Sequence, residues 1–335
     1  MLKSIRFERR FIAHVRILNR NGVSLLKKKD ELDELFAFEN NKQDLVAEAK
    51  RKSTVRMTFI SGLVSLFVLI LIVLIKLQVT PWLLDRELAA QEVYFDVYGA
   101  NLFIGPWEES IRLLDSEATA PQYKLVDGQP VYLGEISNSS RNREVYLSPN
   151  DYETYNYSGE KVMNFIHPAT SITHVPMDVM KLDMFNDQQK IEMGISFDQP
   201  YSLSEVEAML PEESVLQWAW VDVYTDEEVK GNEPARVFTE NEVIGFSMVD
   251  EAGTVLESPV EKFMESVVYG KNHRGPYKQG MEEIYEQLKQ KDEVEETTIK
   301  IVGAVVVGKK EELQQFQNEP RVRASSIGAV INQFN

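Results

Sequence analysis

Few residues in this chain have the type and spacing that chemistry requires. The sequence has no cysteine, which excludes disulfides, cysteine-ligated zinc or iron–sulfur sites and thiol nucleophiles. Its four histidines lie far apart, so none forms a metal-ligand pair with another three to five residues away. They are His14, His167, His174 and His273.

Carboxylates are the remaining candidates. Asp198 and Asp222 could pair as acid and base, but an aspartate at a strand edge or turn is more often solvated or capping. The acidic run DEVEE at 292–296 could hold a divalent cation, yet it lacks the spacing of a calcium loop and is more typical of a solvated linker. We therefore expect a protein that is not an enzyme and that uses no metal or cofactor.

One segment is apolar enough to cross a membrane. The run from Met57 to Ile75 carries no charge, and as a helix its 19 residues span about 28 Å, close to the hydrocarbon thickness of a bilayer. A cleavable signal sequence would begin near the N-terminus and be shorter, whereas 56 residues precede this run. The sequence predicts a single transmembrane helix at 57–76 that stays as an anchor.

Charge is divided unequally about this helix. Residues 1–56 hold 14 Lys/Arg and 8 Asp/Glu, so they carry a net charge of +6, although the whole chain carries −17. Five Lys/Arg residues lie within twenty positions before the span and two within twenty positions after it, so the positive-inside rule places residues 1–56 in the cytoplasm and residues 77–335 outside, in a cell-membrane protein. The acidic total also argues against direct binding of nucleic acid, which requires a basic face.

The inner segment has two helical patterns. Residues 1–20 form an irregular amphipathic pattern that could lie on membrane lipid or pack on a partner. Further on, apolar residues form a stripe among charged ones before Asn40-Asn41 interrupts the pattern. The stripe either enters a groove on a cytoplasmic partner or belongs to a solvated, partly disordered tail. Its candidate partner-binding residues are Leu25, Leu32, Leu35, Phe36 and Phe38.

The outer part begins with a helix and short strands. Thr80-Pro81 opens a helix that reaches about Tyr98, and a Gly/Pro loop is expected at 99–110. Strand candidates follow at 122–126, 130–136 and 143–148. We assign 77–154 to a juxtamembrane helix and a small β region.

Residues 155–335 have stronger signals for one α+β domain. Strands are predicted at 189–200, 214–225, 242–250, 297–308 and 321–331. Helices are predicted from the capping boxes Ser202/Glu205 and Ser258/Glu261, at 281–291 and at 309–317. Two β-α-β units that flank a helical insert indicate an antiparallel or mixed sheet of ferredoxin-like pattern. An aromatic group, Trp218, Trp220, Tyr224 and Phe246, is expected to alternate between the core and one exposed face.

Several segments together resemble the bacterial sigma factor regulator family. They are residues 50–73, 99–107, 195–211, 218–224, 304–316 and 322–331. Over about 46–110 and 155–333 they occur in the order and spacing of membrane-anchored anti-sigma factors that have the family's N-terminal and C-terminal domains. The resemblance implies that the inner segment sequesters an extracytoplasmic-function sigma factor. It also implies that the outer domain regulates this binding in response to envelope stress or a second membrane or envelope protein.

Two functions therefore follow. In the first, the chain is an anti-sigma factor whose residues 1–56 bind a sigma factor. In the alternative, it is an envelope-facing binding or assembly module, and the inner segment only anchors and orients it. The two functions differ in what residues 1–56 do.

Overall fold

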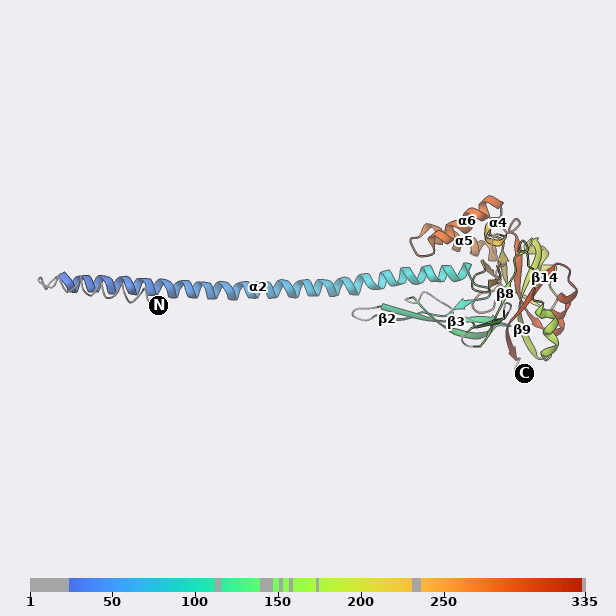
Figure 1. Ribbon diagram of the computed structural model, residues 1–335, viewed down its shortest axis with the longest axis horizontal. Coiled ribbons are helices and arrows are strands. Elements are labelled where there is room, and N and C mark those ends of the chain that lie inside the picture. The colour runs from blue at the N-terminus through green and yellow to red at the C-terminus, as the bar shows by residue number, and fades with distance from the viewer. Residues whose placement is uncertain are drawn as a thin grey trace. The chain divides into compact units, whose positions relative to one another are not determined.

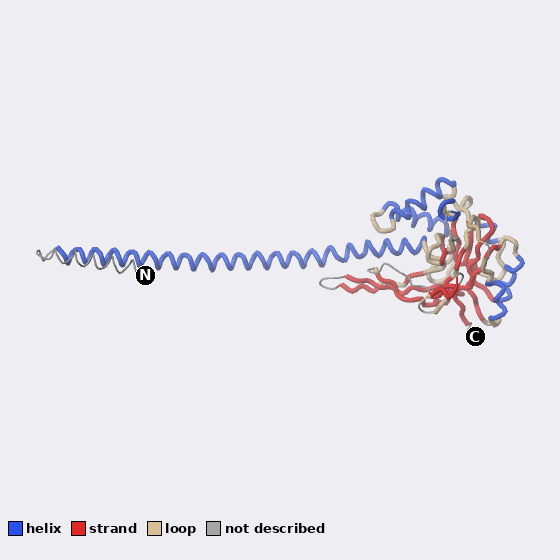
Figure 2. The backbone as a smooth tube through the Cα atoms, viewed as in Figure 1, coloured by secondary structure: helices blue, strands red, loops and turns tan. Residues whose placement is uncertain are grey.

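The computed structural model describes residues 24–111, 116–138, 147–150, 153–156, 159–172, 175–230 and 236–332. The chain divides into two compact units, Met1–Gln78 and Val79–Asn335. The strands of the described residues all belong to the second unit, as the red segments of Figure 2 show. The predicted domain bounds at 56, 76 and 154 stay predictions.

A single long helix, α2 (Ser24–Val97), contains the predicted membrane span. Of the helices that the structure describes, this one is long and apolar enough to cross a membrane, and its apolar window is not buried by protein. The predicted interruption at Asn40-Asn41 and the predicted new start at Thr80-Pro81 are wrong, because α2 continues through both. A proline removes one backbone hydrogen bond, and the helical runs on both sides of Pro81 tolerate this loss.

A small antiparallel sheet follows α2. Its strands are β1 (Phe103–Ile104), β2 (Glu108–Ile111), β3 (Ser116–Val126) and β4 (Gln129–Ser137), and β3 pairs with the other three. The predicted strands at 122–126 and 130–136 are confirmed as a hairpin. Its turn residues Asp127 and Gly128 have φ of 52° and 73°, as a two-residue hairpin turn requires. The predicted loop at 99–110 is wrong in part, since it contains β1 and the start of β2.

Shorter strands form two further small sheets. Strands β5 (Leu147–Asn150), β6 (Glu153–Tyr155) and β7 (Lys161–Val162) form one of them, and β8 (Asn164–Phe165) pairs with β11 (Phe238–Thr239) in the other. The predicted strand at 143–148 falls partly outside the described residues.

The main sheet of the described residues has five strands in the order β12-β10-β13-β9-β14, and all neighbours are antiparallel. These strands are β9 (Gln189–Tyr201), β10 (Val215–Val221), β12 (Gly245–Ser247), β13 (Ile301–Lys309) and β14 (Val322–Asn332). The strands predicted at 189–200, 214–225, 297–308 and 321–331 all lie in this sheet, and the predicted α+β class is confirmed. The ferredoxin-like pattern stays a prediction.

Helices connect these strands. They are η1 (Asp178–Met184), α3 (Leu203–Glu207), α4 (Asp226–Lys230), α5 (Pro259–Asn272), α6 (Lys278–Lys291), α7 (Lys310–Leu313) and η2 (Gln314–Asn318). The Ser202/Glu205 capping box is confirmed. The Ser258/Glu261 box is wrong, because Ser258 makes no side-chain cap bond, although Pro259 begins α5 as predicted. Helices α5 and α6 lie side by side (Figure 1).

The aromatic group belongs entirely to the core. Trp218, Trp220, Tyr224 and Phe246 are at most 7% exposed, so the predicted exposed face is wrong. Strand β10 is covered on both sides, and such strands have continuous rather than alternating burial. The Trp220 indole N–H donates to the Tyr224 hydroxyl at 3.0 Å, which satisfies its polar atom inside the core.

The last turns of α2 belong to the second unit and pack firmly within it. Leu84 and Leu88 are buried with Ala118 of β3. The Tyr94 ring packs against the ring of Tyr277, which precedes α6, with centroids 4.4 Å apart and an interplanar angle of 31°. The end of this helix is therefore held between the small sheet and the α5–α6 pair.

Candidate functional site

The candidate site begins where α2 ends. After Val97 the backbone turns through Gly99 and Asn101, whose φ angles are 96° and 56°. Glycine and asparagine are the residues that adopt this left-handed region most readily. The turn is bound to the segment that follows β11, because the Gly99 N–H donates to the Val243 carbonyl (3.0 Å) and the Ala100 N–H donates to the Glu240 carbonyl (2.7 Å).

Beneath this turn lies a fully buried charged cluster, which we call the junction cluster: Lys124 of β3, Glu192 of β9 and Glu240. The Lys124 ammonium lies 3.0 Å from Glu192 Oε2 and 2.6 Å from Glu240 Oε2. The three side chains are at most 4% exposed. One lysine therefore joins two carboxylates from segments that are distant in the sequence.

Further donors satisfy both carboxylates. Glu240 accepts the Met163 N–H at 2.8 Å, and Glu192 accepts the Ala329 N–H at 2.9 Å. The Asn101 side-chain amide donates to Glu192 Oε1 (2.7 Å) and to the Leu125 carbonyl (2.9 Å). Because every donor comes from a different segment, the junction cluster fixes the turn after α2 to β3, β9 and β14.

The charge balance of the junction cluster is uneven. Burial alone would lower the pKa of Lys124, but the two glutamates outweigh burial and raise it. Burial raises the pKa of Glu240, and Glu192 adds to this effect, whereas Lys124 opposes it. One ammonium cannot fully compensate two carboxylates, so Glu240 holds a proton more readily than an ordinary glutamate. A cluster so enclosed holds segments of the chain together and is not open to contact with a substrate.

A second cluster, which we call the open cluster, comprises His167, Asp222 and Lys291 and borders a cavity of about 720 Å³. Asp222 Oδ1 lies 3.1 Å from His167 Nε2 and 3.0 Å from Lys291 Nζ. His167 Nδ1 accepts the Ala169 N–H, so Nε2 carries the proton and donates to Asp222. Burial would raise the pKa of Asp222, but the histidine hydrogen bond and Lys291 together lower it.

Glu293 lies next to the open cluster. Burial raises its pKa to about 7, and the charge of Asp222 contributes in the same direction. Asp292 ends α6 in the left-handed conformation. The run 292–296 is therefore not the uniformly solvated linker that the sequence predicts, because Glu293 turns inward.

The two candidate carboxylates of the sequence do not form a pair. Asp198 and Asp222 border the same cavity, but Asp198 accepts the Tyr201 hydroxyl at 2.7 Å, while Asp222 binds His167 and Lys291. In the described part of the chain no group of three or more His, Cys, Asp or Glu side chains could hold a metal ion.

The predicted partner-binding residues lie on the first half of α2. The backbone at Leu25, Leu32, Leu35, Phe36 and Phe38 is helical, but their side chains lie outside what the structure describes. Residues 1–20 lie outside the described residues altogether. The sigma-binding stripe therefore stays a prediction.

Sequence reasoning missed the junction cluster. Lys124 and Glu192 interrupt apolar stretches of predicted strands, and such a charge in a core strand is the one signal that they give. Glu240 gives no signal, because it lies in a turn-like polar segment. Only the fold brings the three together.

The described residues form an α+β domain that follows a helix long and apolar enough to cross a membrane. Residues 182–329 match the family model described as sigma factor regulator C-terminal. No curated protein and no solved structure matches the chain. The match confirms the resemblance to the sigma factor regulator family, and it covers the main sheet from the end of η1 through most of β14.

Proposed function

We propose that this chain is a membrane-anchored anti-sigma factor. In this proposal residues 1–56 lie in the cytoplasm and sequester an extracytoplasmic-function sigma factor, and residues 77–335 lie outside and regulate that binding. The observation that carries the proposal is the sigma factor regulator C-terminal match at 182–329 in a chain that also has an uncharged helical span. No catalytic step is part of the proposal.

The charge distribution supports this orientation. Five basic residues lie within twenty positions before the span: Lys42, Lys50, Arg51, Lys52 and Arg56. Only Lys76 and Arg86 follow within twenty positions. A reporter that is active only in the cytoplasm, fused after Asn335, is expected to be silent. Strong reporter activity would reverse the proposed orientation.

The packing of the second unit supports a regulatory role for it. The last turns of α2 are buried through Leu84 and Leu88, and the turn that follows is bound to the junction cluster through Asn101. A change within the domain therefore reaches the helix end directly. Contiguous networks of packed side chains and hydrogen bonds of this kind can carry energetic coupling between two sites.

The main sheet supports a ferredoxin-like core as part of the proposal. In chain order β9, β10, β13 and β14 are the first to fourth long strands, and in the sheet they lie in the order fourth, first, third, second. Short helical segments follow β9 and β13. A ferredoxin-like βαββαβ core places its crossover helices at these positions.

The sigma-binding stripe provides the decisive test. Replacing Leu35 and Phe36 with alanine should release sigma-dependent transcription, because buried apolar anchors typically contribute about 2–4 kcal/mol each to helix-in-groove binding. The amount of protein in the membrane should not change. The matched control is Lys28→Ala with Asp30→Ala, which should keep repression because exposed charges contribute about 0–1 kcal/mol.

A deletion defines the outcome that overturns the proposal. If a chain without residues 1–49 still represses sigma-dependent transcription, the inner segment is not the inhibitor. The protein would then be the envelope-facing binding or assembly module that is the alternative. A pulldown with the isolated inner segment distinguishes the two functions independently, since only the anti-sigma function predicts a stoichiometric sigma factor.

A further inference from the structure

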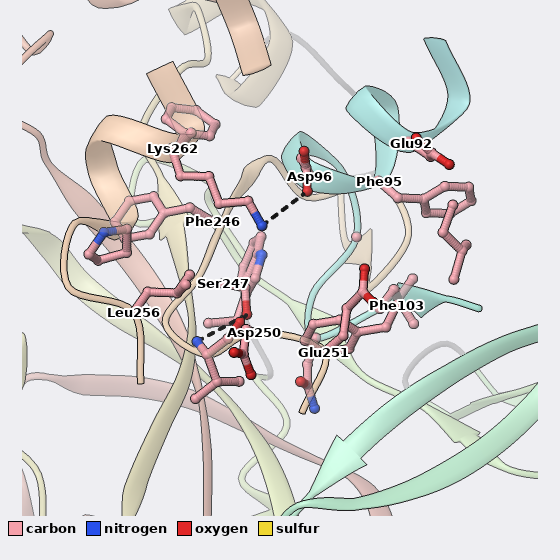
Figure 3. Close-up of a pocket in the computed structure, with 18 of the residues that line it drawn as sticks. Glu92, Phe95, Asp96, Phe103, Phe246, Ser247, Asp250, Glu251, Leu256 and Lys262 are labelled. Carbon is pink, nitrogen blue, oxygen red and sulfur yellow. Dashed lines mark hydrogen bonds and ion pairs between the residues drawn. The ribbon is translucent and has the colours of Figure 1, made fainter. Parts of the chain in front are cut away.

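A groove lies beside the end of α2, within the second unit (Figure 3). Its volume is about 400 Å³, within the usual range for sites that accept a small ligand or a side chain. Its walls come from the last turns of α2, the 99–106 segment, β10, β12, the turn at 247–256 and the start of α5. The groove is separate from the cavity at the open cluster.

Carboxylates outnumber cations on these walls. The lining residues include Glu92, Asp96, Asp250 and Glu251, against the single ammonium of Lys262. Figure 3 shows Lys262 directed at Asp96, and the distance between Lys262 Nζ and Asp96 Oδ1 is 3.6 Å. The groove therefore already holds one ammonium beside a carboxylate and retains an excess of negative charge.

Two of the four carboxylates are not engaged. Asp96 binds Lys262 and accepts the Ser266 hydroxyl, and Asp250 accepts the backbone N–H groups of Ala252 and Thr254. Glu92 and Glu251 are exposed and form no ion pair or hydrogen bond with any residue that the structure describes. They are free to receive a cation from outside.

Aromatic rings form much of the remaining wall. They belong to Phe95, Phe103, Trp218, Phe246 and Phe263. Ring faces attract ammonium and guanidinium groups and also pack on the aliphatic stems of lysine and arginine. Carboxylates together with rings therefore match a basic side chain better than a neutral or an acidic one.

Asn101 provides an independent observation at the same groove. Its side chain is 1% exposed and lines the groove, and its amide nitrogen donates to Glu192 and the Leu125 carbonyl. Its Oδ1 has no hydrogen-bond partner among the described residues. A buried acceptor without a donor is costly, and an N–H donor from a ligand would satisfy it.

We infer that this groove binds a lysine or arginine side chain of an extended peptide segment from a partner protein. Glu92 and Glu251 attract the cation, the rings hold its stem, and Asn101 accepts one of its hydrogens. Since Asn101 also donates to Glu192, an occupied groove contacts the junction cluster. If occupation of the groove is the signal that controls sigma-factor binding, this inference rests on the proposed function.

The test uses the full chain in nanodiscs of neutral phosphatidylcholine, so that lipid does not compete for the cationic probe. A fluorescein-labelled, end-capped Lys-Phe-Lys peptide is titrated by fluorescence anisotropy at roughly 0.15 M salt, where long-range attraction to the acidic domain is screened. Saturable binding is expected, and the capped Glu-Phe-Glu peptide should not bind. The measurement contains no sigma factor, so its failure would leave the anti-sigma proposal standing.

Three variants locate the binding. Glu92→Gln with Glu251→Gln should weaken binding about tenfold, whereas Glu257→Gln with Glu265→Gln, which removes the same charge from exposed positions outside the groove, should change it less than about twofold. Lys262→Met should strengthen binding, a gain that misfolding cannot produce. Equal weakening by both double variants, or no binding of the Lys-Phe-Lys peptide, would overturn the inference. Equally tight binding of free spermidine would replace the peptide ligand with a polyamine.

Discussion

The two charged clusters of the domain each pair a lysine with a carboxylate, but in opposite surroundings. In the junction cluster Lys124 is 1% exposed and is enclosed by two glutamates and the donors of several segments. In the open cluster Lys291 is 26% exposed, binds Asp222 and borders a cavity. Both lysines are paired with carboxylates, but only Lys124 is fully enclosed by protein.

The difference determines how each cluster responds when a charge loses its partner. A buried charge that loses its partner has no water to replace it, so its partners must stay where they are. A charge at a cavity exchanges a protein partner for water at little cost. Substitutions in the junction cluster should therefore lower the free energy of unfolding strongly, and substitutions in the open cluster should lower it only slightly.

The largest effect is expected for Lys124→Met. This variant leaves Glu192 and Glu240 buried without their cation and should lower the free energy of unfolding by about 3–5 kcal/mol. Denaturant unfolding followed by tryptophan fluorescence measures the change. Adding Glu192→Gln and Glu240→Gln should recover much of the loss, because the uncompensated charge is then gone. A single variant as stable as the parent would show that the junction cluster carries no such role.

A smaller loss is expected for Gly328→Ala. A Cβ at this position would clash with the Glu192 carboxylate and would lie 2.9 Å from the Met163 side chain. Overpacking of this kind typically costs about 1–3 kcal/mol. Thermal unfolding provides the measurement, and Gly62→Ala is the control, because no atom lies within 4 Å of the added Cβ. Equal melting temperatures for both variants would contradict the tight packing around Glu192.

The matched substitution in the open cluster is Lys291→Met. Asp222 keeps its hydrogen bond to His167 and gains water, so the free energy of unfolding should fall by only about 1 kcal/mol. The same denaturant experiment allows a direct comparison with Lys124→Met. A loss as large as that of Lys124→Met would remove the distinction between the two clusters.

The smallest effect is a pH dependence at Glu293. Its pKa of about 7 in the folded state lies above the ordinary 4.5, so the folded state binds the proton more tightly and stability falls as the pH rises between these values. Glu293→Gln removes this fall. Because the side chain is partly solvated, the gain should be about 1 kcal/mol at pH 8 and near zero at pH 4. Stability measured across this pH range by denaturant unfolding checks the effect, and a variant whose stability falls with pH as the parent's does would contradict it.

The sequence predicts the main sheet well because its signals are local. Alternation and β-branched residues locate β9 and β14, and Ser202 with Glu205 specifies the start of α3 through a bond within one turn. The burial of Trp218 and Trp220 was harder to predict, since the cover on both faces of β10 comes from residues distant in the sequence.

The junction cluster could not be predicted for the same reason. Lys124 and Glu240 are 116 positions apart, and their bond exists only once the small sheet and the segment that follows β11 have come together. The open cluster likewise joins His167 to Asp222 across 55 positions. The sequence identifies charges in core strands, but only tertiary structure specifies their partners.

The position of β14 has a consequence for the timing of folding. Strand β9 pairs with β13 and β14, so its partners are synthesised a hundred or more residues after it. Strand β14 also supplies the Ala329 N–H to Glu192 and the Ser325 and Ser326 hydroxyls that accept the N–H groups of Val179 and Asn164. The sheet therefore cannot close before residues 322–332 have been synthesised, and a chain that stops before residue 322 would leave one edge of β9 without its partner strand.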